Sequence, residues 1–134
     1  MTLKEYFSTT RGTGVLSTAD AEGRVDAAIY SAPHVLEDGV LAFIMRERLT
    51  YKNTKANPYA AYLYAESGGG YNGIRLFLKK VKEDDNPELV SFMSTRHLTP
   101  EEDVSRGPKH IVYYTVLRIL PLIGSGDVDV IAER

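Results

Sequence analysis

Short runs of β-forming residues alternate with polar turns that end in glycine, and this alternation constrains the fold more than any other feature. Residues 14–18 and 25–32 flank a turn, DAEG, at 20–23. Residues 40–45 follow a second turn, EDG, at 37–39. Turns this short join antiparallel strands, whereas neighbouring parallel strands need a crossover of about a dozen residues. The pattern therefore excludes a parallel doubly wound sheet and favours a small antiparallel barrel.

The rest of the chain extends this pattern. Three more strands are expected, rich in apolar, aromatic and β-branched residues, at residues 59–65, 74–81 and 110–120. Short helices are expected where polar caps and prolines punctuate the sequence, at residues 2–8, 50–57 and 84–97. The run VLAFIM at 40–45 is apolar throughout, so this strand is expected to be covered on both faces. We predict a mainly β (α+β) fold, a six-stranded antiparallel barrel with two or three short helices.

Size and composition indicate one domain, spanning residues 1–134, with no linker that divides it. With 43% apolar and 25% charged residues, the chain can bury a core without disulfides. It has no cysteine, which excludes disulfides, thiolate metal sites and thiol catalysis. The opening MTLKEYF is too polar for a secretory signal, and no apolar run is long enough to span a bilayer. A cytoplasmic protein is expected, and its net charge of −2 indicates neither a nucleic-acid partner nor a membrane surface.

A basic segment, RERLTYKNTKANP at 46–58, stands at the expected start of a helix. Cations normally favour the other end of a helix, because the macrodipole makes the N-terminus electropositive. With Thr50 as the N-cap, its hydroxyl and the free N–H groups of residues 51–53 would form an anion site that suits a phosphate. Arg46 and Arg48 would add charge-assisted hydrogen bonds. The alternative is an ordinary capped helix whose cations are solvated or paired with the neighbouring glutamate.

Other candidate motifs carry weaker signals. The loop GGG at 68–70 lacks the GK[ST] of a P-loop, so it indicates a hairpin loop, or one whose Tyr71 or Asn72 closes over a ligand. The three histidines are far apart and have no metal-ligand spacing: His34, His97 and His110. No serine stands in a G-x-S-x-G elbow, and no residue is identified as catalytic. Metal sites are not expected.

The order of these segments resembles the FMN-binding split β-barrel family related to pyridoxamine 5′-phosphate oxidase. The resemblance covers about residues 10–123, and its order and spacing matter more than any single motif. In that family a strand, a turn and a strand precede a basic segment, a short helix and an Asn-Pro. The matching residues here are Gly39, Phe43, Arg48, Thr50, Asn53, Asn57 and Pro58. The later GYNGIRLFLKK and VLRILPLIG also look like segments of small flavin-binding members.

The resemblance implies that FMN lies across the barrel at the interface of a homodimer. The residues expected to flank the isoalloxazine ring are Ile29, Tyr30, Ser31 and Ala32. The residues expected to line the ring or the ribityl chain are Ile44 and Met45. Those expected to surround the phosphate are Arg46, Arg48, Leu49, Thr50 and Lys52, with Asn53 orienting the helix start or the ribityl side. The cations of the basic segment would then be offset by a phosphate dianion.

The sequence also departs from the oxidase pattern. The oxidase has an arginine on the second strand where this chain has Ala27-Ala28, and an Arg-Lys pair where it has Leu49-Thr50. No counterpart of the oxidase's C-terminal substrate-binding segment is found, so the resemblance does not extend to vitamin B6 oxidation. The expected function is an FMN-dependent oxidoreductase acting on a small-molecule redox substrate or electron donor. The alternatives are a non-catalytic flavin electron carrier, or a split barrel that uses deazaflavin or haem, with His34 and His110 as the candidate haem ligands.

Overall fold

A computed structural model of the chain describes residues 1–93 and 100–132. Within them, seven strands form one antiparallel sheet in the order β2-β1-β5-β6-β7-β4-β3. The strands are β1 (Gly12–Ala19), β2 (Val25–Ile29), β3 (His34–Val35), β4 (Leu41–Arg46), β5 (Tyr59–Glu66), β6 (Gly73–Asp84) and β7 (Lys109–Pro121). The helices are α1 (Leu3–Thr9), α2 (Leu49–Ala56), α3 (Pro87–Met93) and α4 (Pro100–Ser105). The mainly β class and the antiparallel pairing are confirmed.

The strand and helix numbers differ from the prediction. The expected six-stranded sheet has a seventh member, β3, which is only two residues long and pairs with β4 through His34 and Ala42. The helix α4 was not expected either. The helix predicted at 84–97 begins at Pro87 because the Asn86 side chain caps its first N–H groups, and its part beyond Met93 lies outside the described residues.

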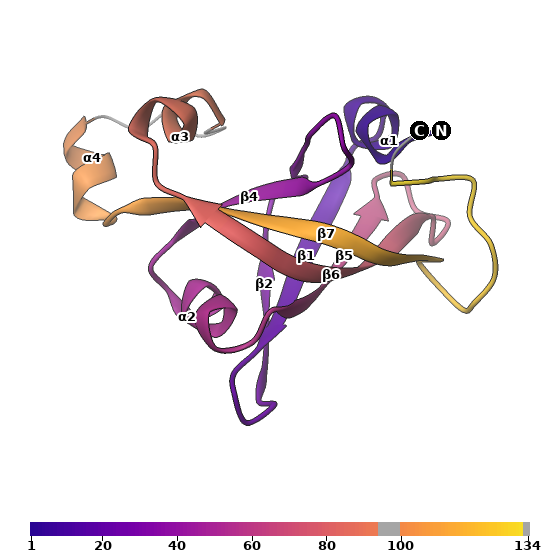
Figure 1. Ribbon diagram of the computed structural model, residues 1–134. Helices are drawn as coiled ribbons and strands as arrows, with labels where there is room; N and C mark the ends of the chain where they lie inside the picture. Colours follow the sequence, from indigo (N-terminus) through magenta and orange to yellow (C-terminus); the bar gives the residue numbers. More distant parts are fainter. Residues whose placement is uncertain (94–99, 133–134) are drawn as a thin grey trace.

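The two ends of the sheet are linked by α2 rather than by a strand pair. In the ladder, β2 and β3 are the edge strands, at opposite ends of the sheet order. The helix α2 packs against β1, β2 and β4, so it lies between the two ends. Figure 1 shows the long β6 and β7 crossing the sheet, with α2 on one side and α3 and α4 grouped together at another end. This arrangement leaves a site where β2, β4 and the start of α2 approach one another.

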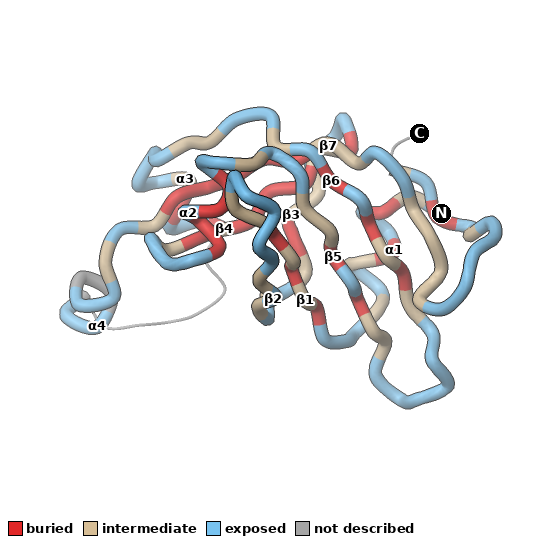
Figure 2. The backbone as a smooth tube through the Cα atoms, turned by 90° about the horizontal axis from the view of Figure 1, so that it is seen from below, coloured by how far each residue is buried: buried red, intermediate tan, exposed pale blue. Residues whose placement is uncertain are grey.

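The apolar strand β4 is covered on both faces, as predicted. Leu41, Phe43 and Met45 belong to the main core cluster, which also contains residues of α1, β1, β5, β6 and β7. Ala42 and its neighbour Ile44 face a second, smaller cluster with α3 and β7. Figure 2 shows this concentration of buried backbone around β4, with exposed segments at the periphery. A strand buried on both faces explains why the sequence here is apolar without alternation.

The second strand ends at Ile29, three residues earlier than the predicted 25–32. The N–H of Tyr30 still donates to the Gly14 carbonyl at 3.0 Å, but Pro33 has no N–H to continue a ladder. The chain then passes from one end of the sheet to the other before β3. Conversely, β6 runs past the predicted 74–81, with register shifts at Phe77/Leu78 and Lys80/Lys82 that bend the strand.

Close packing of β1 against β5 predicts that Gly14→Ala will be destabilising. A Cβ at Gly14 would overlap the hydroxyl of Tyr62, which donates to the Tyr30 carbonyl at 2.9 Å. Forcing the ring aside would lose this bond and strain the core, which is expected to lower the free energy of unfolding by about 1–3 kcal/mol. Urea denaturation would measure the loss. Thr13→Ala, at an exposed position of the same strand, serves as the control, and equal losses in the two variants would refute the packing argument.

Candidate functional site

A cavity of about 550 Å³ lies between β2, β4, residues 30–34, the start of α2 and residues 106–109. Its volume lies within the range of roughly 300–1,000 Å³ that is typical of small-molecule sites. The lining includes most of the residues predicted for the cofactor: Ile29, Tyr30, Ser31, Ala32, Ile44, Arg46, Arg48, Leu49 and Thr50. The segments that supply them are far apart in the sequence, and the fold brings them together.

Three predicted site residues lie outside this lining. Met45 is fully buried in the main core, so its side chain faces away from the cavity. Lys52 is exposed on α2. Asn53 is 4% exposed, and its amide donates to the Thr18 hydroxyl at 3.1 Å. That bond ties α2 to β1 and thereby fixes where the helix begins.

The start of α2 differs from the prediction, because Thr50 is not the N-cap. The N-cap is Arg48, whose backbone is extended and whose side chain makes no cap hydrogen bond. The first helical hydrogen bond runs from the Lys52 N–H to the Arg48 carbonyl at 3.0 Å. The N–H groups that precede this first bond therefore belong to residues 49–51, not 51–53. The helix begins earlier than expected because the chain is already turning at Arg48, whose own N–H donates to the Arg46 carbonyl.

Thr50 is a buried residue of the first helical turn. It is 4% exposed, and its hydroxyl lies 3.5 Å from the Asp26 carboxylate on β2. Burial raises the pKa of Tyr30, against the opposing effects of a hydrogen bond with Thr50 and the charge of Arg48. The Tyr30 hydroxyl therefore keeps its proton at neutral pH and remains a hydrogen-bond donor. Its ring meets that of Phe43 edge-on, with centroids 6.1 Å apart.

One end of the cavity is cationic. Arg46 ends β4 and pairs in register with Lys109 at the start of β7. The Arg46 guanidinium donates to the Gly107 carbonyl at 2.6 Å, which holds it beside the 106–109 segment. Arg48 and Arg106 also line the cavity. Asp26 is the one carboxylate among the lining residues of the described chain.

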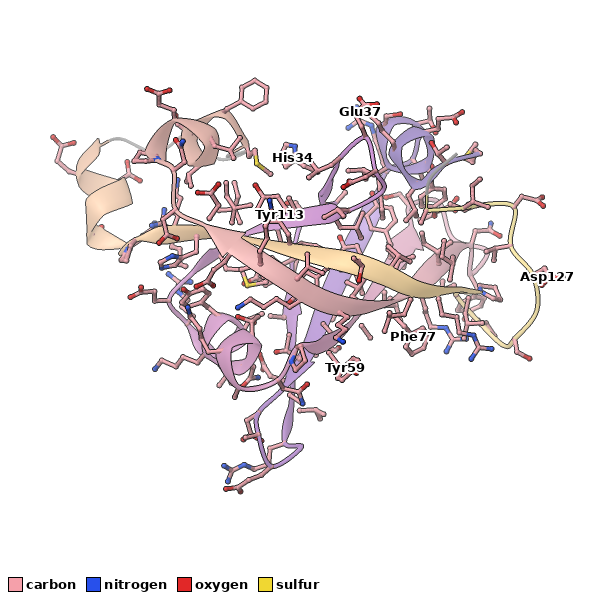
Figure 3. The ribbon with its side chains drawn as sticks, in the orientation of Figure 1. His34, Glu37, Tyr59, Phe77, Tyr113 and Asp127 are labelled. Carbon is pink, nitrogen blue, oxygen red and sulfur yellow. The ribbon has the colours of Figure 1, made fainter. Side chains whose placement is uncertain are left out.

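The other end is mainly apolar. Pro33, Ala42 and Met93 line it together with His34. The His34 Nε2 lies 2.8 Å from the Met93 carbonyl, and Figure 3 shows the labelled His34 between β4 and α3. The cavity thus runs along β4, with cations at one end and apolar side chains at the other.

Several lining residues were missed from the sequence. Arg106 and Lys109 belong to RGPK at 106–109, which directly precedes the last predicted strand. The available signal was the basic character of that segment. Its proximity to Arg46 depends on the pairing of β4 with β7, and sequence alone does not specify this register.

Two residues that the sequence suggested as ligand contacts, Tyr71 and His110, do not line this cavity. Tyr71, expected to close over a ligand, is 79% exposed in the loop between β5 and β6 and does not line it. His110 also lies outside the lining, and both of its ring nitrogens contact carboxylates.

Among the described residues, no group of three or more His, Cys, Asp or Glu side chains forms a metal site. None of the helices in the described chain is long and apolar enough to cross a membrane.

Comparison with known proteins identifies relatives by structure only. No family model matches the chain, and no curated protein matches it. An F420 reductase is 19% identical, with 86% of this chain and 94% of that chain covered and a TM-score of 0.67. An FMN-binding protein from Syntrophomonas wolfei is 17% identical, with 92% and 86% covered and a TM-score of 0.72. A proposed pyridoxamine 5′-phosphate oxidase from Lactobacillus delbrueckii is 13% identical, with 87% and 89% covered and a TM-score of 0.64. The resemblance is confirmed for the fold.

Proposed function

We propose that this protein is an FMN-binding oxidoreductase that holds the flavin in the 550 Å³ cavity at the interface of a homodimer. The observation that carries the proposal is the polarity of the cavity, which has four cationic lining residues toward one end, with Asp26 as the one carboxylate among the described lining residues, and mainly apolar ones toward the other. FMN has the matching polarity, with a phosphate at one end and a flat ring at the other. The shared fold with an FMN-binding protein supports the same assignment.

The phosphate is assigned to the start of α2. The backbone N–H groups of residues 49–51 are aligned with the electropositive end of the helix dipole, and Arg48 lines the cavity at the same point. A phosphate held there would gain charge-assisted hydrogen bonds from the arginine. This arrangement offsets the repulsion between Arg46 and Arg48 and gives the basic segment a physical role.

The ring is assigned to the wall formed by β2, β4 and the segment between β2 and β3. Tyr30, Ala32 and Ile44 supply aromatic and aliphatic surface for a planar ligand. Tyr30, still protonated at neutral pH, is available as a donor to a ring or ribityl oxygen. When bound, the flavin supplies hydride or electron transfer, and the protein supplies position, charge and exclusion of water.

The homodimer is assigned to the outer face of the sheet. Val15 pairs with Ile29 on one side and Leu63 on the other, and Ala61 pairs with Phe77. These side chains alternate with the buried ones, so they share the face opposite the core. Among them, Ile29 is 78% exposed, Leu63 is 38% exposed and Phe77 is 37% exposed. Exposed apolar side chains gathered on one face of a sheet, here interrupted by Arg75 opposite Leu63, are typical of a subunit interface.

The flanking residues extend this face. Val25 is 81% exposed and Tyr59 is 55% exposed. Figure 3 shows the labelled Tyr59 and Phe77 on the same side of the β6–β7 ribbons, away from α1 and α3. Because Ile29 both lines the cavity and belongs to this face, a partner subunit docked here would cover part of the cavity mouth.

A deazaflavin is the second candidate cofactor, favoured by the structural likeness to an F420 reductase. Arg106 and Lys109 add cationic groups beyond the start of α2. These two cationic side chains could bind the further anionic groups of a deazaflavin that carries such groups in addition to one phosphate. Haem receives less support, because His110 has both ring nitrogens occupied by carboxylate contacts.

An absorption spectrum after incubation with FMN and desalting tests the proposed function. We expect the protein to retain an oxidised-flavin spectrum in about one equivalent per subunit. Reduction of the bound flavin by NADH or NADPH, followed by reoxidation with a substrate, would distinguish an enzyme from a simple electron carrier. A protein that retains no FMN but retains a deazaflavin would favour the second candidate, and retention of neither would refute both.

A further inference from the structure

His110 contacts a carboxylate with each of its ring nitrogens. Nδ1 lies 2.5 Å from the Asp85 Oδ1, and Nε2 lies 2.8 Å from the Glu47 Oε2. The residue is 8% exposed, and the Tyr51 ring of α2 stacks on it with centroids 4.3 Å apart and an interplanar angle of 6°. His110 thereby joins β7, α2, the β4–α2 connection and the segment between β6 and α3.

Two carboxylate partners require two donors on the imidazole. A neutral ring carries one N–H, so it can donate to either Asp85 or Glu47, whereas the imidazolium donates to both. Burial lowers the pKa of His110, but the hydrogen bonds with the two carboxylates outweigh this effect and raise the pKa above its ordinary value. The contact geometry is therefore that of the protonated residue.

Other charged groups near the stacked His110 and Tyr51 rings contact Tyr51 and not His110. Its hydroxyl is 3.2 Å from the Glu83 carboxylate, which also pairs with Lys55 and with Lys80. The Lys55 ammonium lies 5.0 Å from the Tyr51 ring centroid. Glu83 and the two lysines together leave one net positive charge, but their contacts are with one another and with Tyr51, so Asp85 and Glu47 are the charged groups in direct contact with His110.

Glu47 stands between the two arginines of the basic segment. Arg46 and Arg48 line the cavity, but Glu47 does not. Its side chain is 50% exposed and is directed to His110 instead. Solvent weakens the attraction between a half-exposed glutamate and its arginine neighbours but does not remove it. The bond to His110 directs the carboxylate away from the cationic end of the cavity.

We propose that protonated His110 is a positioning residue that holds the Glu47 carboxylate away from Arg48 and so keeps the cationic end of the cavity available to an anion. When His110 loses a proton, its remaining N–H stays at Nδ1, in the shorter contact with Asp85 (2.5 Å, against 2.8 Å to Glu47), so Glu47 is released and competes with the anion for the arginine. The inference rests on the proposed function, in which the anion is the phosphate of FMN. It adds pH-dependent control of cofactor binding to that function.

The direction in which FMN affinity changes with pH follows from the coupling between FMN binding and the protonation of His110. His110 is charged below its raised pKa, so its contribution to FMN affinity is complete at acidic pH and is lost as the pH rises through that pKa. By reciprocity, bound FMN must raise the pKa of His110 by the same factor. The phosphate of FMN acts in the opposite direction, because it gains its second charge near about pH 6. Variants must therefore be compared with the wild type at each pH.

The test measures the dissociation constant of FMN by fluorescence quenching between about pH 5.5 and 8.5. At the acidic end, His110→Gln is expected to bind FMN roughly five- to tenfold more weakly than the wild type, at the lower end of typical coupling. Glu47→Gln is expected to retain acidic-side affinity and to lose the decline at higher pH. The double variant is expected to bind as Glu47→Gln does, because the harm done by removing His110 is caused by the released carboxylate.

The matched control is Glu37→Gln, which removes an exposed carboxylate paired with Lys4 and far from the cavity lining. A double variant as weak as His110→Gln would show that His110 acts only through stability, and would overturn the inference. So would identical pH profiles for the wild type and Glu47→Gln. Binding that occurs but does not depend on His110 would overturn this inference alone, whereas no FMN binding at any pH would overturn the proposed function as well.

A second measurement decides the question if His110→Gln does not fold. The pKa of His110 in the wild type can be followed by NMR with and without saturating FMN. We expect the pKa to rise on FMN binding, and the same rise to be absent in Glu47→Gln. A pKa unchanged by FMN in the wild type would overturn the inference.

Discussion

Arg48→Ala is expected to weaken FMN binding by about 1.5–3 kcal/mol, the range for a hydrogen bond to a charged group, or roughly ten- to a hundredfold in the dissociation constant. Arg48 lines the cavity at the start of α2, where the helix dipole and the N–H groups of residues 49–51 already favour an anion. Its side chain makes no cap hydrogen bond, so its removal should leave the stability of α2 nearly unchanged. Fluorescence titration measures the affinity, and thermal unfolding without ligand checks the stability.

The matched control is Lys52→Ala, which removes a cation of the same helix that does not line the cavity. We expect less than a twofold change in affinity, because an exposed charge is screened by solvent and salt. Equal losses in the two variants would indicate that the helix acts only through its overall charge. An unchanged affinity in Arg48→Ala would place the phosphate elsewhere in the cavity.

Leu63→Asp is expected to convert the proposed dimer to a monomer. Leu63 lies in the middle of the apolar outer face, between Val15 of β1 and Arg75 of β6. An aspartate there would be buried in the dimer, and the neighbouring Arg75 already donates to the Pro121 and Gly124 carbonyls, so burial of the new charge is expected to cost several kcal/mol and to weaken association by more than about a hundredfold. Size-exclusion chromatography with light scattering at micromolar concentration would show the change in mass.

Phe92→Asp provides the control for this surface. Phe92 is 84% exposed on α3, so it is an equally apolar substitution site away from the outer face. We expect this variant to keep the wild-type mass, and a monomer in both variants would argue against the outer face as the interface. The amount of FMN that the Leu63→Asp monomer retains is a second measurement. Loss of bound FMN would support a cofactor site that the partner subunit completes.

Local features of the sequence predicted the elements well where short-range physics decides them. Thr2 and Glu5 form the capping box that begins α1, and the Asp20 side chain organises the turn before β2. The two-sided burial of β4 followed from its unbroken apolar run. In each case the residues that make the contact are close in the chain, so the pattern alone was sufficient.

The parts that depend on distant contacts were missed. The strand β3 has only two residues, too few to show a period, and exists because His34 and Val35 meet β4. Thr50 resembled an N-cap by residue type, yet the turn at Arg48 places it inside the helix, where it contacts Asp26. Lys109 lies at the site because β7 pairs with β4 in a register that places it opposite Arg46. Turn chemistry and apolar runs carry no information about such register.

The bond from Arg46 to the Gly107 carbonyl joins residues that are 61 positions apart in the chain. Such a contact forms only after a large loop has been closed, at a considerable entropic cost. The cationic end of the cavity is therefore incomplete in any partly folded chain in which β4 and β7 have not met, because Arg106 and Lys109 are then missing from it. An anionic ligand that binds there favours the completed fold, so its binding would raise the fraction of the protein that is folded and protected from proteolysis.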